Sequence, residues 1–212
     1  MSETAEKPDS SPVSETGTLA IVLAAGQGTR MNSEIPKVLF PVCGQPLARH
    51  VVNALQSAGI SKIVLVVGFR EDLVREEFAG DPNIAFATQH QRLGTGHAVQ
   101  MCQQHLTEHN GQVLVVTGDS PLIQSESIKA LLEFQREQQL ACVLGSLISE
   151  DPTGLGRIVR NAEGEFTGIV EHKDASEDQR LIQEVNMSTY VFDSHHLQWS
   201  LKQLKTNNTQ NE

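Results

Sequence analysis

The segment Leu19–Ala25 is a continuous run of apolar side chains that stops at Gly26. An apolar run without alternation predicts a strand that is buried on both faces, as strands inside a parallel sheet are. Gly26 and Gly28 follow directly, and glycine lets a backbone curl so that several N–H groups point at one anion. The segment therefore predicts an α/β domain with a ligand-binding loop after a buried strand.

Patterns typical of strands and helices alternate along the chain up to about residue 149. The further expected strands are 62–69, 83–89, 113–117 and 141–149. The expected helices are 46–58, 71–79, 95–106 and 125–139, the last with Ser125 as its capping residue. This alternation predicts a mostly parallel sheet with helices on both faces.

The alternation of strand and helix patterns ends after residue 149. Arg157–Asn161 and Glu165–His172 flank a turn-like Ala-Glu-Gly and predict a β-hairpin inserted late in the chain. A strand at Glu184–Asp193 and a helix at Ser194–Leu204, with its leucines inward, are expected to follow. Residues 1–17 are polar and rich in Ser, Thr, Glu and Pro, so we expect a disordered tail before a single domain at 18–212.

The charge balance excludes some classes of partner. Sixteen basic residues against 26 acidic ones give a net charge of −10. A general nucleic-acid or anionic-membrane binder needs a basic surface, so neither partner is expected. The three cysteines show no paired spacing, no apolar run reaches the roughly 18 residues of a membrane span, and no secretory signal is present. We therefore expect a cytoplasmic protein that binds any phosphate at a local site.

The glycine loop after the first expected strand is the first candidate for that site. Arg30 and Lys37 follow Gly26 and Gly28, and the stretch 26–50 is locally positive. Its charged residues are Arg30, Lys37 and Arg49 against Glu34. Met31 stands where a dinucleotide-binding fingerprint has its third glycine, and no Gly-Lys-Ser/Thr of a P-loop follows. The loop is interpreted as a polyphosphate pocket, with a simple tight turn as the alternative.

Two other expected strands end in polar segments. Thr117-Gly118-Asp119 places a carboxylate at a strand tip, which suits Mg²⁺ bound to phosphate oxygens; the alternative is a carboxylate that caps the next turn. Gln89 ends another strand and is able to read the edge of a base, while the Gly94–Gly96 backbone can pass close to a ring. A loop with Thr95 as a helix cap explains that segment equally well.

Together these segments resemble a known enzyme family. The blocks are LAAGQGTRMNSEIPKVLFPVCGQPL, QRLGTGHA, VVTGDSPL, DPTGLGRIVR and GIVEHKDASEDQRLIQEVN. From Leu19 to Glu212 the chain is similar to the uridylyltransferase domain of bacterial bifunctional UDP-N-acetylglucosamine pyrophosphorylase/glucosamine-1-phosphate acetyltransferases. The first block marks sugar nucleotidyltransferases in general, whereas DPTGxGRI with VEHKDA points to N-acetylglucosamine 1-phosphate as acceptor.

The resemblance implies a Rossmann-like nucleotide-diphospho-sugar transferase fold, Mg²⁺ as cofactor, and transfer of uridylyl from UTP to N-acetylglucosamine 1-phosphate. It also implies site residues. Those at the nucleotide are Leu23, Ala24, Ala25, Gly26, Lys37, Gln89, Gly94, Thr95, Thr117 and Gly118. Arg30 and Lys37 match phosphate contacts and Asp119 the metal ligand. Those at the sugar are Gly156, Glu171 and Asn186.

The chain also departs from the family. Thr117 stands where an aromatic residue is frequent, and the chain stops before an asparagine that in the resembled domain also binds the metal. The β-helix acetyltransferase domain, through which the family trimerises, is absent, so we expect a monomer without acetyl transfer. Two alternatives stay open: transfer between another nucleotide and sugar phosphate, and a weakly active or regulatory UDP-N-acetylglucosamine-binding relative.

Overall fold

The computed structural model describes residues 17–28, 31 and 33–204, in two compact units. The first unit contains the described residues up to Val143 and from Val191 onward, and the second is Leu144–Tyr190. The predicted tail lies outside the described residues except for its last position, Gly17.

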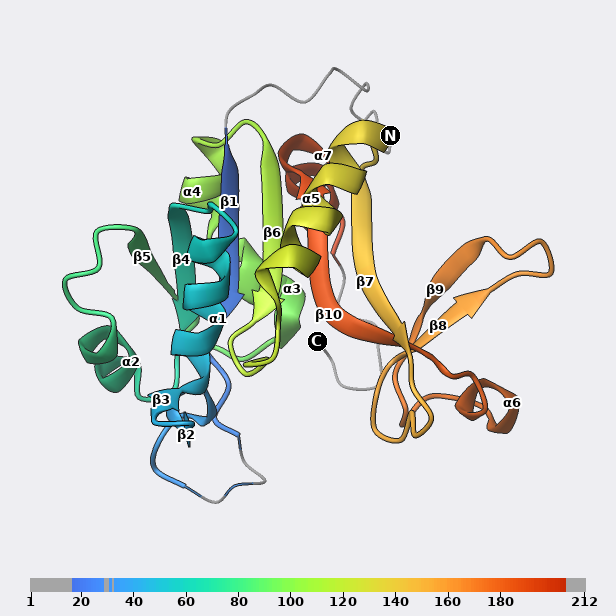
Figure 1. Ribbon diagram of the computed structural model, residues 1–212, viewed down its shortest axis with the longest axis horizontal. Helices are drawn as coiled ribbons and strands as arrows, with labels where there is room; N and C mark the ends of the chain where they lie inside the picture. Colours follow the sequence, from blue (N-terminus) through green and yellow to red (C-terminus); the bar gives the residue numbers. More distant parts are fainter. Residues whose placement is uncertain (1–16, 29–30, 32, 205–212) are drawn as a thin grey trace, which may run out of the picture. The chain divides into compact units, whose positions relative to one another are not determined.

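Parallel strands form the centre of the first unit. They are β1 (Thr18–Leu23), β4 (Lys62–Val67), β5 (Ile84–Thr88) and β6 (Gln112–Thr117). Their order across the sheet is β5-β4-β1-β6, followed by β10 (Glu184–Asp193). At its carboxyl end β1 pairs through Leu23 with Val66 on one side and Thr117 on the other (Figure 1).

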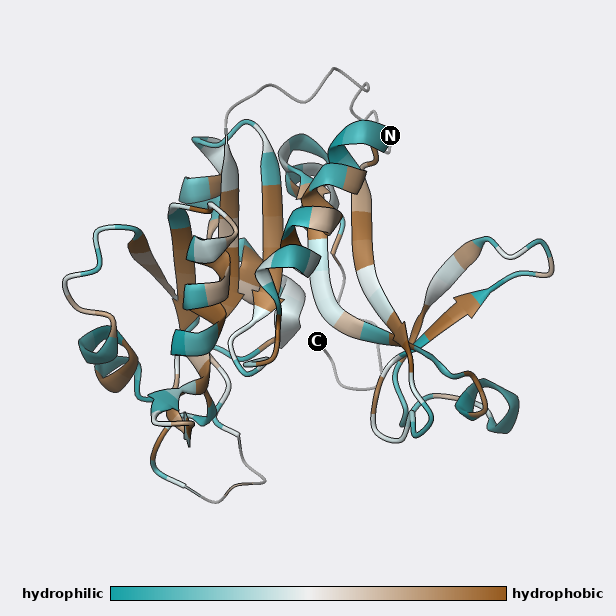
Figure 2. Cartoon of the chain, in the orientation of Figure 1, coloured by the Kyte–Doolittle hydropathy of each residue, from teal (hydrophilic) through white to brown (hydrophobic). Residues whose placement is uncertain are grey.

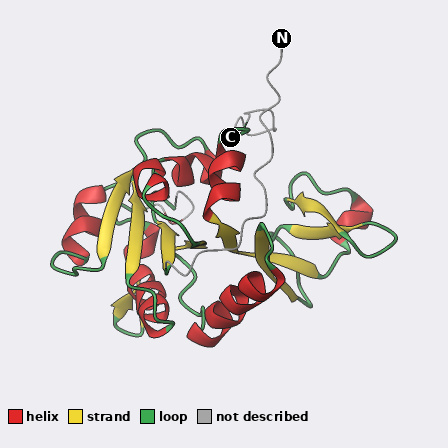
Figure 3. Ribbon diagram, turned by 90° about the horizontal axis from the view of Figure 1, so that it is seen from above, coloured by secondary structure: helices red, strands yellow, loops and turns green. Residues whose placement is uncertain are grey.

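Helices cover both faces of this sheet, as Figures 1 and 3 show. On one face lie α1 (Leu47–Ser57) and α5 (Ser125–Gln138). On the other lie α3 (Gly94–Gln100), α4 (Gln103–Thr107) and α7 (Ser194–Leu201). Helix α2 (Glu71–Glu77) connects β4 to β5, and the 3₁₀ helix η2 (Lys37–Leu39) precedes a short hairpin of β2 (Pro41–Val42) and β3 (Gln45–Pro46).

The apolar run of β1 is explained by burial on two sides. Successive side chains of a strand point to opposite faces. Ala20 and Val22 belong to the core that also contains Val51 and Leu55 of α1, while Ile21, also fully buried, points to the opposite face. Figure 2 shows the same apolar character along the neighbouring strands.

The second unit is built on antiparallel pairing. Strands β8 (Arg157–Arg160) and β9 (Phe166–Val170) form a hairpin, and β8 also pairs with β10. In the hairpin turn the side chain of Asn161 accepts hydrogen bonds from the backbone N–H groups of Glu163 and Glu165. Strand β7 (Cys142–Ile148) pairs with β10, and α6 (Glu177–Arg180) begins with a capping box.

These elements confirm the predicted α/β class with a mostly parallel sheet, helices on both faces and a late β-hairpin. They also correct three details. The expected helix 95–106 is two helices, because Cys102 leaves the helical backbone with ψ of 12°. Helix α5 has Gln124, not Ser125, at its N-cap, and the Ser125 hydroxyl donates to Glu126 instead. Helix α7 ends at Leu201, so Leu204 is not inward but 52% exposed.

Among the described residues, the helices are all too short or too polar to cross a membrane.

The core around α1 is expected to control stability. Leu55→Ala removes a side chain that is 0% exposed, so we expect the free energy of unfolding to fall by about 2–5 kcal/mol. Leu122, which is 82% exposed, is the control, and Leu122→Ala is expected to change that free energy by less than about 0.5 kcal/mol. Urea unfolding of both variants measures the difference, and equal losses would contradict this placement of the core.

Candidate functional site

The strand order creates a point where the chain changes direction across the sheet. From β1 the chain continues to β4 and β5 on one side, and it then returns to the other side of β1 to form β6. Open parallel sheets bind ligands at the carboxyl ends of strands beside such a switch point. Three predicted site segments start there: the glycine loop after β1, Gln89 after β5 and Gly118-Asp119 after β6.

Backbone hydrogen bonds extend beyond the strands and hold these segments together. The N–H of Gly118 donates to the carbonyl of Leu23 at 2.9 Å, and the N–H of Gln89 donates to Val67 at 2.8 Å. A Cβ atom on Gly118 would lie 3.2 Å from the Leu23 oxygen, so a larger residue here would push these two segments slightly apart.

A cavity of about 280 Å³ opens at this edge. The predicted site residues that line it are Leu23, Ala25, Gly26, Lys37, Gln89, Gly94, Thr95, Thr117 and Asp119. Ala24 and Gly118 are buried and do not line the cavity. Arg30 lies outside the described residues.

Gly28 determines where Lys37 lies. Its φ is +65°, in the left-handed region that favours glycine. A Cβ atom at this position would lie 2.8 Å from the Cβ of Lys37, closer than side chains approach. The second glycine of the loop therefore makes room for the lysine that follows it on η2.

Lys37 and Asp119 form an ion pair across the cavity, with 2.5 Å between Nζ and Oδ2. Both side chains are partly exposed, at 44% and 30%. In the described part of the chain, the Asp119 carboxylate accepts from Lys37 and not from the turn that follows it. The turn-capping alternative for Asp119 therefore has no hydrogen bond to support it.

The Gln89 side chain is fixed by contacts with the residues that follow it in the chain. Gln89 is 5% exposed, and its Nε2 donates to the carbonyl of Gly94 at 3.0 Å and lies 3.0 Å from Nδ1 of His97. Helix α3 begins at Gly94 with Leu93 at its N-cap, so Thr95 is not the helix cap. The amide is thus fixed in orientation at the wall of the cavity.

Arg92 is a cavity residue that the sequence analysis missed. Its guanidinium donates to the side-chain oxygen of Gln27 at 3.2 Å, which links the 89–95 loop to the glycine loop. The sequence signal was present, since Arg92 lies between two segments already singled out.

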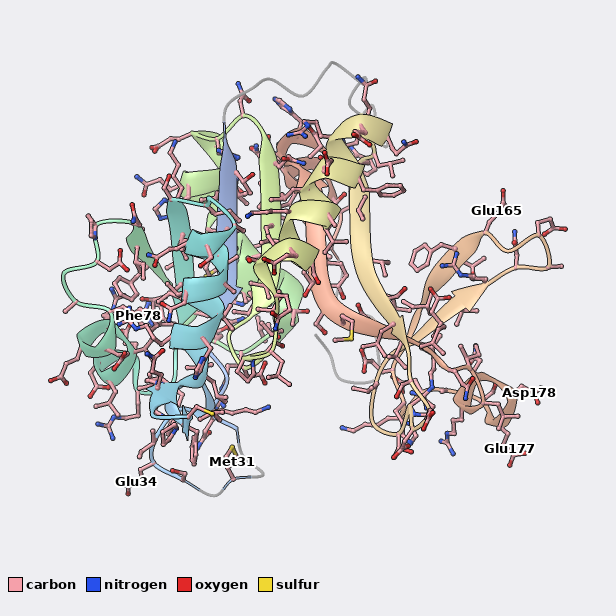
Figure 4. All side chains as sticks on the ribbon, in the orientation of Figure 1. Met31, Glu34, Phe78, Glu165, Glu177 and Asp178 are labelled. Atoms are coloured by element: carbon pink, nitrogen blue, oxygen red, sulfur yellow. The ribbon has the colours of Figure 1, made fainter. Side chains whose placement is uncertain are left out.

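Arg49 was wrongly counted among the charges near the glycine loop. It donates to Glu77 at 3.1 Å and stacks 4.1 Å from the ring of Phe78, which Figure 4 labels beside α2. The same figure labels Glu34, the one acidic residue counted in the stretch 26–50, on the loop between β1 and η2.

The predicted sugar residues lie in the second unit and are close to one another. The N–H of Asn186 donates to the carbonyl of Gly156 at 2.9 Å. A Cβ atom on Gly156 would lie 3.2 Å from Oε1 of Glu171, so that carboxylate passes directly over the glycine. The Asn186 amide also donates to the hydroxyl of Tyr190 at 2.6 Å.

The donor set near Asp119 fits one kind of metal binding. Within the described residues, His, Cys, Asp and Glu nowhere gather in threes that could hold a metal ion. Mg²⁺ takes one or two carboxylates and completes its shell with water and substrate phosphate oxygens. Asp119 therefore suits a metal that arrives with a polyphosphate.

The contact between Gly28 and Lys37 is testable without a ligand. A water-soluble carbodiimide joins an amine to a carboxylate only when they touch, so Lys37 and Asp119 are expected to cross-link. Gly28→Ala should lower the yield several-fold, because the new Cβ displaces Lys37. Gly44→Ala is the control, since Gly44 also has a positive φ, +81°, but has nothing within 4 Å of an added Cβ. Mass spectrometry of the digested protein measures the yield, and equal yields in both variants would contradict this role of Gly28.

Comparison with known proteins relates the chain to a group of bacterial proteins. Proteins named bifunctional protein GlmU from Geobacillus thermodenitrificans, Brevibacillus brevis and Streptococcus thermophilus are each 45% identical to it over 193 residues. The matches cover 91% of this chain but only 41–42% of the relatives, so the chain spans about two fifths of their length.

Solved structures share the fold. A putative glucose-1-phosphate thymidylyltransferase from Bacillus anthracis matches with a TM-score of 0.75 and 20% identity over 89% of this chain and 76% of its own. A UDP-glucose pyrophosphorylase complexed with UDP-glucose matches with a TM-score of 0.73 and 18% identity, over 93% and 82%.

The family model described as the MobA-like NTP transferase domain matches residues 20–165, which contain most of β1, the glycine loop, Gln89 and Asp119. The chain belongs to the MobA-like NTP transferase domain family.

Proposed function

We propose that the chain transfers uridylyl from UTP to N-acetylglucosamine 1-phosphate, which gives UDP-N-acetylglucosamine and pyrophosphate. The observation that carries the proposal is the cavity at the switch point, where a glycine loop, a lysine–aspartate pair and a fixed glutamine amide meet. Membership of an NTP transferase family and 45% identity to GlmU proteins support it.

The nucleotide half of the proposal uses the first unit. Nε2 of Gln89 is occupied by Gly94 and His97, so its Oε1 is the atom left to accept from the N–H of a uracil ring. Lys37 and Arg92 line the same cavity and supply positive charge for the triphosphate. Arg30, which the sequence analysis placed on the phosphates, stays part of this proposal on sequence grounds alone.

Asp119 is proposed to hold Mg²⁺ together with the phosphates of UTP. When bound, Mg²⁺ neutralises charge on the phosphate oxygens and makes the α-phosphorus easier to attack. In the structure Lys37 neutralises Asp119 at 2.5 Å. With nucleotide and metal bound, Asp119 would hold the metal ion, and Lys37 would be available to a phosphate oxygen.

The reaction needs positioning more than acid–base catalysis. A phosphate oxygen of the sugar phosphate is already anionic, so it attacks the α-phosphorus of UTP without a general base. The bond from that phosphorus to the bridging oxygen breaks, and pyrophosphate leaves with the electron pair. Holding the reactants in line and offsetting their negative charge account for the rate.

The acceptor half uses the second unit. Gly156, Glu171 and Asn186 form one group of contacts, with a carboxylate and an amide that suit sugar hydroxyl and acetamide groups. Cytoplasmic location stays a prediction from the sequence.

The experiment that tests the function is release of pyrophosphate by the 212-residue chain from UTP, Mg²⁺ and N-acetylglucosamine 1-phosphate. Parallel reactions replace UTP by CTP, GTP or dTTP, and the acceptor by glucose 1-phosphate. A preference for another pair would identify a different sugar nucleotidyltransferase. Binding of UDP-N-acetylglucosamine in calorimetry without turnover would identify a binding protein instead and contradict the proposed reaction.

Asp119→Asn is expected to lower kcat by at least about 100-fold, because it removes the carboxylate proposed to fix Mg²⁺. Asp72→Asn, which also breaks an ion pair but lies on α2, is the control and is expected to keep its activity. Circular dichroism checks that both variants fold. Activity of the Asp119 variant within a few-fold of the starting protein would show that this carboxylate is not the metal ligand.

Glu171→Gln is expected to raise the KM for N-acetylglucosamine 1-phosphate by about tenfold or more while leaving the KM for UTP nearly unchanged, because the charged acceptor proposed to bond the sugar becomes a neutral amide. The exposed Glu177, labelled in Figure 4, provides the control Glu177→Gln. Steady-state kinetics with each substrate varied in turn measure both constants. An equal rise for both substrates would remove Glu171 from the acceptor side.

A further inference from the structure

Arg157 is a charged side chain in the interior of the second unit. It is 1% exposed and is among the largest fully buried side chains of the described chain. It stands at the start of β8, where its backbone pairs with β10 through Val185 and with β9 through Val170. A guanidinium keeps its charge at any physiological pH, so this charge must be compensated by neighbouring groups.

The hydrogen bonds that Arg157 donates go to neutral acceptors, and the carboxylate of Asp151 interacts with its charge without a hydrogen bond. Nη1 donates to the carbonyl of Leu155, and Nη2 donates to the carbonyl of Arg180 at 3.3 Å and lies 3.1 Å from Nδ1 of His172. Among the described residues, no carboxylate forms an ion pair with it, and Nε is buried without a hydrogen-bond partner. A buried charge with so few partners is costly for the fold, which points to a reason for it beyond stability.

The three acceptors lie on three different segments. Leu155 directly precedes Gly156, His172 directly follows Glu171, and Arg180 ends α6. Since arginine has only donors, Nδ1 of His172 must be the acceptor in this contact, and this fixes the tautomer and orientation of that ring. The guanidinium of Arg157 therefore connects Leu155, the neighbour of Gly156, with His172, the neighbour of Glu171. Gly156 and Glu171 are two of the residues that we place at the sugar.

Gly156 and Glu171 lie close to each other. An added Cβ on Gly156 would lie 3.1 Å from Ile169 and 3.2 Å from the Glu171 carboxylate, and the carbonyl of Gly156 accepts from Asn186 at 2.9 Å. A shift of the 155–156 segment against the 171–172 segment would move the glycine, the carboxylate and the amide relative to one another.

We propose that Arg157 is a positioning residue for the acceptor: its buried guanidinium clamps the 155–156 and 171–172 segments so that Gly156 and Glu171 present one fixed surface to the sugar phosphate. It acts through its neighbours and does not touch substrate. This inference rests on the proposed function for the identity of the ligand, but the clamp itself is a property of the ligand-free chain.

The main variant is Arg157→Met, which keeps most of the side-chain volume and removes both the charge and the planar set of N–H donors. Replacing a buried charge by an apolar group is frequently neutral for stability, so the variant is expected to fold. Its KM for N-acetylglucosamine 1-phosphate should rise about tenfold or more, with the KM for UTP changed less than about twofold. Arg157→Lys should not restore the constant, because an ammonium cannot reproduce the planar fork.

The matched control is Arg160→Met on the same strand. Arg160 is exposed and forms an ion pair with Glu184 at 2.8 Å, so its loss should leave both constants unchanged. His172→Ala serves as the second variant if Arg157→Met does not fold, since it removes one end of the clamp at a partly exposed position. It should raise the same KM, and the two substitutions together should be far from additive.

Hydrogen–deuterium exchange of the ligand-free chain separates this inference from the function. The amides of Asn186 and Asp174, which donate to Gly156 and Glu171 at 2.9 Å, should exchange faster in Arg157→Met, while the amide of Ala24 in the first unit should not. If the starting protein does not turn over the two substrates, the proposed function fails and exchange alone decides the clamp. The positioning role of Arg157 would be overturned if Arg157→Met raised both KM values equally or if Arg157→Lys restored the KM for the acceptor. It would also be overturned if the amides of Asn186 and Asp174 exchanged at unchanged rates.

Discussion

The parallel pairing of β1 with β4 and β6 is the constraint on which the rest of the first unit depends. Leu23 lies in register with Val66 and Thr117, so the segments that follow these strands start side by side. The side chains of β1 are buried on both faces, which prevents the strand from slipping, since a shift by one residue would exchange its two faces. The loop with Gly28 and the carboxylate of Asp119 meet because that register is fixed.

The two units hold their polar groups in different ways. In the first unit, opposite charges face each other across an open cavity, and Lys37 and Asp119 are exposed enough to exchange partners with an incoming anion and cation. In the second unit, a charge is buried behind the polar surface and bonds only to neutral acceptors, so it has no exchangeable partner. The first arrangement is suited to charge neutralisation during a reaction, and the second to holding a shape.

Two side-chain positions show how a local sequence rule acts through tertiary contact. Glycine at position 28 was expected to let the backbone curl around an anion, and the structure adds that it makes room for Lys37 nine residues later in the chain. Arg49 was expected to add charge to the same loop, but α1 carries it to Glu77 and the ring of Phe78. Proximity in the sequence placed Lys37 beside the glycine loop, because only a short loop separates them. It failed for Arg49, because this residue lies on a helix that directs it elsewhere.

The sequence by itself determined the class of fold, the strands that lead into the site and the residues at their carboxyl ends, because apolar periodicity and glycine placement are local properties. It did not determine the break at Cys102 or the exposure of Leu204, which depend on what each helix packs against. Nor did it reveal that Arg92 reaches Gln27 or that Arg157 is buried. From the sequence alone, a buried arginine in a strand cannot be distinguished from an exposed one. Only the tertiary structure brings its carbonyl and imidazole acceptors from three segments to one guanidinium, and only that arrangement makes burial of the charge possible.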